Sequence, residues 1–353
     1  MRGDRGDTRP RTRRKWGRGA LMMVCGAAQS WGWCGVWRGG GMRRSRALAT
    51  ALCVLGVSAC APVPEIVSAA APPDPQPLAI AQEPTLGDSV RAHFERQEQT
   101  LRGRGLMRTD AEARDIPFGV NTLVRNFDRI ALRDEYVLAG GRLIERETGA
   151  RLRRWDRPVR LALEFGEAVP PEQRAIDSAQ LRDLAVRLGR ITGHPVTITE
   201  GVETANFRVL VLTEEERRAI GPRLRALIPS IDATLEDTIA NLPLSVSCMV
   251  IGFARAGTHV HTQAVAVIRA ELPELTRTSC FHEEIAQGLG LPNDSAAARP
   301  SIFNDSLEFA VLTRHDEALL RILYDPRLQP GMGPAEARPI VEAIAVELLG
   351  GES

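Results

Sequence analysis

The sequence has few aromatic residues, a single lysine and no long apolar run. Phe, Trp and Tyr make up only 5% of the 353 residues, and Lys15 is the only lysine, so arginine carries nearly all of the basic charge. No stretch of 18 apolar, uncharged residues occurs, whereas a membrane-spanning helix needs about 20. The sequence therefore excludes a protein that crosses the membrane several times. A hydrophobic content of 44% is still ample for a buried core.

The charge is balanced overall but uneven along the chain. Residues 1–59 contain 12 basic and 2 acidic residues, which leaves 33 basic and 42 acidic residues, a net charge of −9, in residues 60–353. Proteins that bind nucleic acid usually present a basic patch to the phosphates. The acidic body therefore argues against nucleic acid as a partner.

The N-terminal part resembles an export signal preceded by unrelated sequence. Residues 1–41 hold four of the five tryptophans among Arg and Gly, and without apolar periodicity they predict neither a helix nor a strand. We therefore expect translation to begin at Met42. From there a basic segment leads into the apolar segment 47–57 and then into Val57-Ser58-Ala59-Cys60, which resembles the lipobox of bacterial lipoproteins. The alternative is an ordinary signal peptide followed by a chance cysteine.

The lipobox resemblance implies a membrane anchor. Residues 42–59 would be a lipoprotein signal peptide, and Cys60 would carry the acyl chains that hold the protein stably in a membrane. Residues 60–87 are rich in proline and alanine, a composition typical of an extended tether. We therefore expect a globular body in the bacterial cell envelope, facing the periplasm or the exterior.

Cysteine usage agrees with export. Beyond Cys60 only Cys248 and Cys280 remain. An even pair in an oxidising compartment predicts one disulfide, which would close a loop of about 32 residues and stabilise the fold by roughly 3–4 kcal/mol. Two buried free thiols are the alternative.

Hydrophobic periodicity and capping signals predict a mixture of helices and strands. The order of these elements along the chain indicates an α+β layer fold. We expect a helical segment over 88–114 and one domain over 115–349. We expect helices over 89–102, 120–129, 171–191, 278–289, 314–324 and 335–349 and a helix capped by Thr213 and Glu216. Asp88 is the expected N-cap of the first helix, and residues 313–316, from Thr313 to Asp316, are expected to cap helix 314–324. Strands are expected over 159–165, 196–199, 207–212, 246–253 and 262–268, with a hairpin closed at Gly140-Gly141.

A candidate site lies in the helix that follows Cys280. His282-Glu283 begins the zinc-peptidase pattern H-E-x-x-H, but Ala286 occupies the second histidine position, so the direct match fails. Shifted by one residue, the segment resembles the metzincin motif H-E-x-x-H-x-x-G-x-x-H. The resemblance puts Glu283, Gln287 and Asn293 at the three ligand positions, Glu284 at the catalytic acid/base and Gly290 at the turn glycine.

This resemblance implies a zincin-like domain, a mixed sheet with an active-site-type helix, in which every histidine ligand is replaced. Strand 264–268 would precede the helix as the active-site strand does in zincins. Ser301-Ile302-Phe303 stands where a methionine-containing turn would lie, with phenylalanine in place of methionine.

Longer segments resemble a bacterial family known as domain of unknown function 2927. The similarity covers about residues 115–349, and many members of the family resemble exported lipoproteins, in agreement with Cys60. No activity is established for the family. The matching segments are residues 282–294, 300–305, 315–317, 319–326 and 330–332.

The replaced ligands leave several interpretations of the site open. Neutral Gln and Asn oxygens are poor zinc ligands, so Glu283, Gln287 and Asn293 favour Ca²⁺, Mg²⁺ or Mn²⁺ over zinc. The same residues would otherwise be ordinary polar groups on an exposed helix face, or would line a metal-free groove for peptide or glycan. A hydrolase with Glu284 as general base is a further alternative, but it needs an activated water.

We therefore expect no cofactor and a peptidase-like module that binds polypeptide or cell-wall material without catalysis. A metal-dependent hydrolase and a purely structural envelope lipoprotein are the alternatives. His259 and His261 could form a metal pair, but they follow a turn at Gly257 and are expected to be exposed loop residues.

Overall fold

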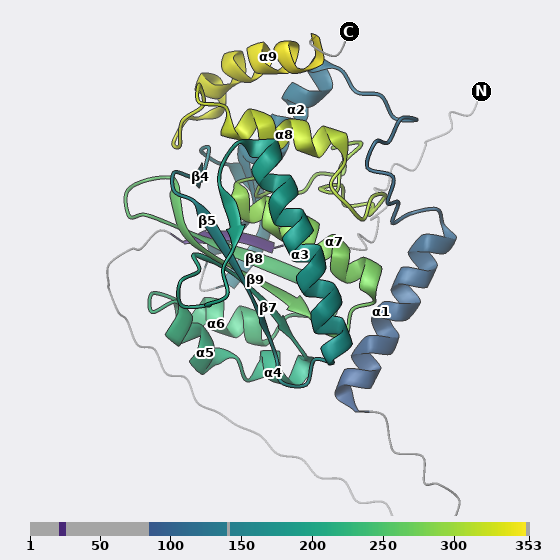
Figure 1. Cartoon of the computed structure of the whole chain (residues 1–353). Coiled ribbons are helices and arrows are strands. Elements are labelled where there is room, and N and C mark those ends of the chain that lie inside the picture. The colour runs from purple at the N-terminus through teal and green to yellow at the C-terminus, as the bar shows by residue number, and fades with distance from the viewer. Residues whose placement is uncertain (1–20, 26–84, 140–141, 351–353) are drawn as a thin grey trace, which may run out of the picture. The chain divides into compact units, whose positions relative to one another are not determined.

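The computed structural model describes residues 21–25, 85–139 and 142–350 (Figure 1). The expected signal peptide at 42–59, the lipidation site Cys60 and the tether up to residue 84 lie outside the described residues. The described segments belong to one compact unit. Among them, no helix combines the length and the apolar character that a membrane crossing requires.

A seven-stranded sheet forms the centre of this unit. Its strands pair in the order β1-β8-β9-β7-β5-β6, and the short strand β4 pairs with β9. Every pair is parallel except β8 with β9. The strands are β1 (Leu21–Cys25), β4 (Arg154–Trp155), β5 (Val159–Phe165), β6 (Val196–Ile198), β7 (Phe207–Leu212), β8 (Cys248–Ala254) and β9 (Val260–Arg269).

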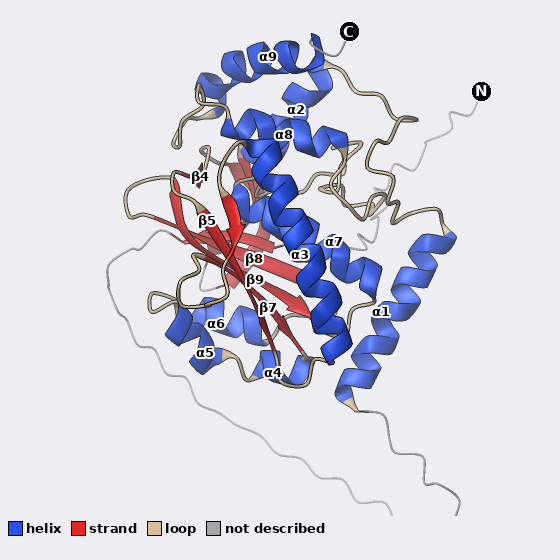
Figure 2. Ribbon diagram, in the orientation of Figure 1, coloured by secondary structure: helices blue, strands red, loops and turns tan. Residues whose placement is uncertain are grey.

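Helices cover both faces of the sheet (Figure 2). Strand β7 is buried at all six positions, and such continuous apolar strands are typical of a sheet that is covered on both sides. Because neighbouring side chains point to opposite faces, Val209 and Val211 pack in the same core as α3 (Pro171–Thr192) and α7 (Glu274–Leu289). Leu210 and Leu212 pack instead with the short helices of the other face. These are α5 (Gly221–Leu227) and α6 (Ala233–Ala240), and the shorter α4 (Glu214–Arg218) precedes them in the chain.

The protein is thus of the mixed α/β class, with a mainly parallel sheet. The expected mixture of helices and strands is present, but helices alternate with strands instead of following them as in the predicted α+β layers. The difference arises partly from α5 and α6. Each is only two turns long, which is too short for apolar periodicity to distinguish a helix from a loop.

Strand β1 corrects one expectation. Residues 1–41 were expected to contain no strand, yet Leu21–Cys25 pairs in parallel with Met249–Phe253 of β8. The segment Leu-Met-Met-Val-Cys is a run of five apolar residues, and five residues are an ordinary strand length. Its hydrogen-bonding partner lies more than 200 residues away, so the local sequence could not show the pairing.

The remaining helices lie at one end of the sheet and along its side (Figure 1). Helix α2 (Val120–Ala131) packs against α9 (Pro334–Gly350) and α8 (Arg314–Tyr324). Next to α2, strands β2 (Arg133–Ala139) and β3 (Arg142–Gly149) form the expected hairpin, whose turn at 140–141 lies outside the described residues. Helix α1 (Leu86–Gly103) begins three residues earlier than expected, because Thr85, not Asp88, is its N-cap.

Candidate functional site

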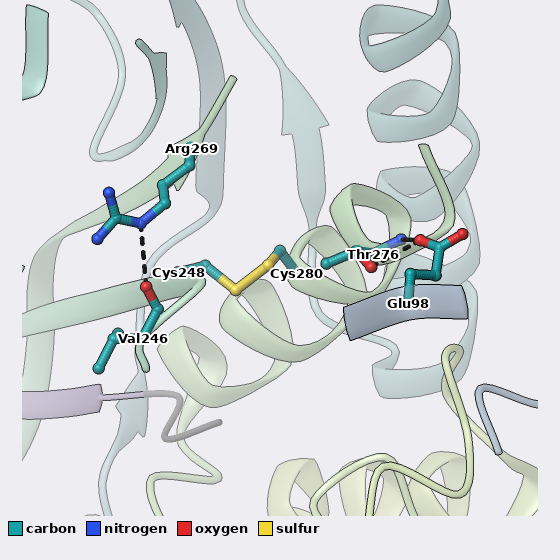
Figure 3. The surroundings of a disulfide bond; sticks show 6 residues. All are labelled: Glu98, Val246, Cys248, Arg269, Thr276 and Cys280. Atoms are coloured by element: carbon teal, nitrogen blue, oxygen red, sulfur yellow. Dashed lines mark hydrogen bonds between the residues drawn. A yellow bond between two sulfur atoms is a disulfide. The ribbon is translucent and has the colours of Figure 1, made fainter. Parts of the chain in front are cut away.

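Helix α7 carries the candidate site, and its first turn is held by two other helices. Glu98 of α1 accepts hydrogen bonds from the backbone N of Thr276 at 3.0 Å and from its Oγ1 at 2.7 Å (Figure 3). Asp177 of α3 accepts from Nε of Arg277 at 2.7 Å. These carboxylates satisfy and neutralise groups at the helix N-terminus that would otherwise be buried without partners. They explain why α7 begins at Glu274, four residues before the expected start.

The other end of α7 is fixed by a glycine and by side-chain donors. Gly290 ends the helix with φ +130°, and a Cβ at this position would lie 2.2 Å from the backbone oxygen of Arg153. Trp155 Nε1 donates to the oxygen of Gly288 at 2.9 Å, and the Tyr324 hydroxyl donates to the oxygen of Leu289 at 2.9 Å. The last carbonyls are therefore satisfied from outside the helix. The chain therefore turns at Gly290, the residue that aligns with the turn glycine of the metzincin motif.

The polar residues of α7 are buried. Glu284 and Gln287 have no exposed surface (0%), and Glu283 retains 6%. The interpretation of these residues as ordinary polar groups on an exposed helix face is therefore wrong. Helix α7 packs against β8, β9, β1 and α3, and helix periodicity alone could not show which of its faces these elements cover.

Two carboxylates and a disulfide meet at this face. One carboxylate oxygen each of Glu283 and Glu284 and the sulfur of Cys248 all lie within 4.8 Å of one another. Cys248, at the start of β8, is joined to Cys280 of α7 by a disulfide (Figure 3). A disulfide sulfur is not a thiolate and is no metal ligand. Two carboxylates this close repel each other in a buried setting, and a cation or a shared proton between them would relieve that repulsion.

The other two predicted ligands make structural hydrogen bonds. Gln287 Nε2 donates to Oδ1 of Asp294 at 3.0 Å, and Asn293 Nδ2 donates to the backbone oxygen of Arg129 in α2 at 2.7 Å. The Asn293 amide thus ties the loop after α7 to α2. Gln287 Oε1 is buried and accepts no hydrogen bond from the described residues, so it is the better candidate of the two for an oxygen ligand beside Glu283.

The nearby histidines are buried, neutral groups. His282 Nδ1 accepts from the backbone N of Leu312 at 3.1 Å, and burial, with a smaller effect of Arg187, lowers the pKa of His282 to about 3. Burial likewise lowers the pKa of His261 to about 4, with Arg153 contributing. His261 is 1% exposed, which corrects the expectation of an exposed loop residue. Strand β9 begins earlier than predicted, so His261 points inward against Trp155.

A buried polar network centres on Asp316 at the start of α8. The sequence indicated only the part of it that caps this helix. Asp316, expected only as part of the N-terminal cap of α8, accepts from the backbone N of Thr313 at 2.8 Å. The same carboxylate accepts from Ser301 Oγ at 2.5 Å and from the backbone N of Ile302 at 3.0 Å. It therefore pins the segment 301–303, where a metzincin would have its methionine turn, to the start of α8. The Thr-x-x-Asp spacing was the only local signal of this role.

Fold and site together define a mixed α/β protein with a buried pair of carboxylates beside a disulfide. The model of a family described as Protein of unknown function (DUF2927) matches residues 121–343. The chain therefore belongs to this family, as its sequence motifs indicated. No curated protein and no solved structure matches the chain. The metzincin resemblance and the lipid anchor stay predictions.

Proposed function

We propose that this protein is a lipoprotein, anchored in the bacterial cell envelope through Cys60, whose family domain binds extended polypeptide without cleaving it. The disulfide between Cys248 and Cys280 supports export, because structural disulfides persist in oxidising compartments. The lipobox at Cys60 and the proline-rich tether support anchoring at a membrane surface.

Three features of the candidate site favour binding over catalysis. A general base must reach the water that it deprotonates, but the Glu284 side chain has no exposed surface in the chain that retains β1. The amide of Asn293 is engaged with the backbone of α2, and the sulfur of Cys248 is in a disulfide. No imidazole or thiolate is therefore available among these groups to hold a zinc ion that would activate water.

The pairing of β1 with β8 is the observation that carries the binding proposal. Strand β8 lies between β9 and β1, and β1 comes from residues upstream of Cys60. Translation from Met42, or cleavage before Cys60, would leave the mature chain without β1, and the outer edge of β8 would then carry unpaired N–H and C=O groups. Such an edge accepts an extended peptide by adding it to the sheet. Residues 21–25 would then occupy this edge only in the uncleaved chain.

A peptide-binding experiment tests this directly. A fluorescent peptide with the sequence of residues 19–27, carrying Cys25→Ser, is titrated into the mature protein and into the full-length chain that retains β1. We expect saturable binding to the mature protein and at least roughly tenfold weaker binding to the full-length chain, because its own β1 competes from the same molecule at high effective concentration. Equal binding to both forms would contradict the proposal.

Two controls sharpen the result. The same peptide with N-methyl groups at alternate residues keeps its side chains but loses the N–H donors of one edge, so it should not bind. Mass spectrometry of the protein extracted from membranes should find a chain that begins with an acylated Cys60. A Cys60→Ser chain that still fractionates with membranes would refute the anchor while leaving the peptide result intact.

A divalent-metal hydrolase is the second candidate. It is favoured by the approach of the Glu283 and Glu284 carboxylates within 4.8 Å and by the buried oxygen of Gln287. Elemental mass spectrometry of the wild type and of Glu284→Gln decides between the two functions. One metal per wild-type chain, lost in the variant, would replace the binding proposal with the hydrolase, whereas equal traces in both would end the enzyme hypothesis.

A further inference from the structure

A second candidate site lies away from α7, in a pocket of about 500 Å³ between α2, the β2–β3 hairpin and α9. We propose that this pocket binds an anionic amphiphile, a small molecule with a phosphate-type head and an apolar body. The volume is within the range of about 300–1,000 Å³ that is usual for small-molecule sites. The lining combines an arginine-rich rim with an apolar floor.

The rim has an excess of positive charge. Four arginines (Arg125, Arg129, Arg133 and Arg338) and two carboxylates (Asp128 and Glu147) line the pocket, a formal net charge of +2. The two carboxylates both pair with Arg133, at 3.1 and 3.3 Å. Arg338 pairs with Glu342 on the exposed side of α9. With Glu342 counted, the formal net charge is +1, and among the described residues Arg125 and Arg129 are the two rim arginines without a carboxylate partner.

Arg125 and Arg129 are poised to share one anion. They are four residues apart on α2, so their side chains lie on the same face, where like charges destabilise a helix. Within the described part of the chain, the Arg125 guanidinium has one hydrogen-bond partner, the hydroxyl of Thr122, at 3.3 Å. Among the described residues the Arg129 guanidinium has no hydrogen-bond or ion-pair partner. An oxyanion between them would remove the repulsion, and guanidinium groups bind phosphate oxygens through paired hydrogen bonds.

The floor of the pocket is apolar. Val124, Phe127 and Leu132, from α2 and the residue that follows it, and Val341 of α9 line it. These side chains keep only 1–6% of their surface exposed, so they present a narrow apolar strip that is already fixed by packing. A ligand that is only an anion would leave this surface unused, and a neutral apolar ligand would leave the arginines unpaired. An anionic head on an apolar body satisfies both.

Calorimetric titration of octyl phosphate tests the proposal. The protein is the full-length chain with Cys60→Ser, which cannot be acylated at that position and needs no detergent. We expect one site per chain, with affinity that falls as salt rises. Arg129→Gln should weaken binding by roughly tenfold or more, the usual effect of losing a charge-assisted hydrogen bond. The matched control is Arg182→Gln, an exposed arginine on α3, which should bind as the wild type does.

Comparison ligands separate the two halves of the pocket. Inorganic phosphate and octyl glucoside should each bind at least roughly tenfold more weakly than octyl phosphate, because each lacks one of the two interactions. Equal binding of either one, or equal affinity of Arg129→Gln and the wild type at matched unfolding midpoints, would overturn the proposal. So would the absence of any octyl phosphate binding.

A vesicle experiment identifies the source of the anion. Phosphatidylglycerol vesicles that displace octyl phosphate from the wild type would assign the pocket to a lipid headgroup at the membrane surface. Vesicles that leave octyl phosphate bound would assign it to a free phosphorylated amphiphile. The test is independent of peptide binding at β8, because none of the lining residues belongs to that strand.

Discussion

Reduction of the Cys248–Cys280 disulfide offers a quantitative test of how the core is held together. The two cysteines are 32 residues apart in the sequence. In the loop-entropy model a closed loop of this length removes about 12 cal/mol/K from the unfolded chain, or about 3.7 kcal/mol at 25 °C. Both side chains are buried where β8 meets α7, so the surrounding core should keep them in place after reduction. The free energy of unfolding should therefore fall by about 3–4 kcal/mol, through the unfolded state.

The assay is urea unfolding followed by far-ultraviolet circular dichroism, with and without a dithiol reductant. The wild-type midpoint should shift to lower urea on reduction, and the slope should rise because the unfolded chain becomes less compact. A Cys248→Ala, Cys280→Ala variant should resemble the reduced wild type, with an additional loss of about 1 kcal/mol because two sulfur atoms leave the packed core.

The alanine variant also serves as the control. It lacks the Cys248–Cys280 disulfide, so its unfolding should not respond to the reductant. The cysteines elsewhere in the chain remain in it. A wild type that loses less than about 1 kcal/mol on full reduction would refute the loop-entropy reasoning. An equal response of wild type and variant would show that another pair of cysteines is responsible.

Three further predictions concern the ends of α7 and the groups packed around it. Gly290→Ala should destabilise the fold by about 3 kcal/mol or more in urea unfolding, because its Cβ would collide with the Arg153 backbone, whereas Gly103→Ala, with open space around it, should be neutral or slightly stabilising. The unfolded state protonates His261 near pH 6.5 and the folded state only near pH 4, so stability is lost as the pH falls through this window. At pH 4.5 the free energy of unfolding of the wild type should be lower by about 2 kcal/mol for this reason, whereas His261→Gln should not show this loss. If the free energies of unfolding of the two proteins depend on pH in the same way, His261 is not the group responsible. Asp316→Ala should cost about 3 kcal/mol or more, since it strands several buried donors, and should leave α8 more open to hydrogen exchange at its first turn.

Much of the local structure was predictable because its causes are local. Apolar periodicity located α3, α8 and α9 and strands β5 and β7 to within a few residues, and the Thr213 and Thr313 capping signals marked two helix starts. Gly290 marked the end of α7 for the same reason, since only glycine adopts that backbone conformation without strain. The family relationship was also readable, because its motifs are continuous stretches of sequence.

The order of strands and the burial of polar groups could not be read in the same way. Nothing near Leu21 or Met249 in the sequence indicates that these segments pair, because the hydrogen bonds of a sheet join distant residues. Likewise Glu283, Glu284 and Gln287 have the pattern of an exposed helix face. Only the packing of α7 against the sheet and its neighbouring elements buries them and brings two carboxylates to the disulfide. The sequence by itself determined most of the long helices and strands. The tertiary structure decided which distant segments pair and which polar residues leave water, and that decides what the site can bind.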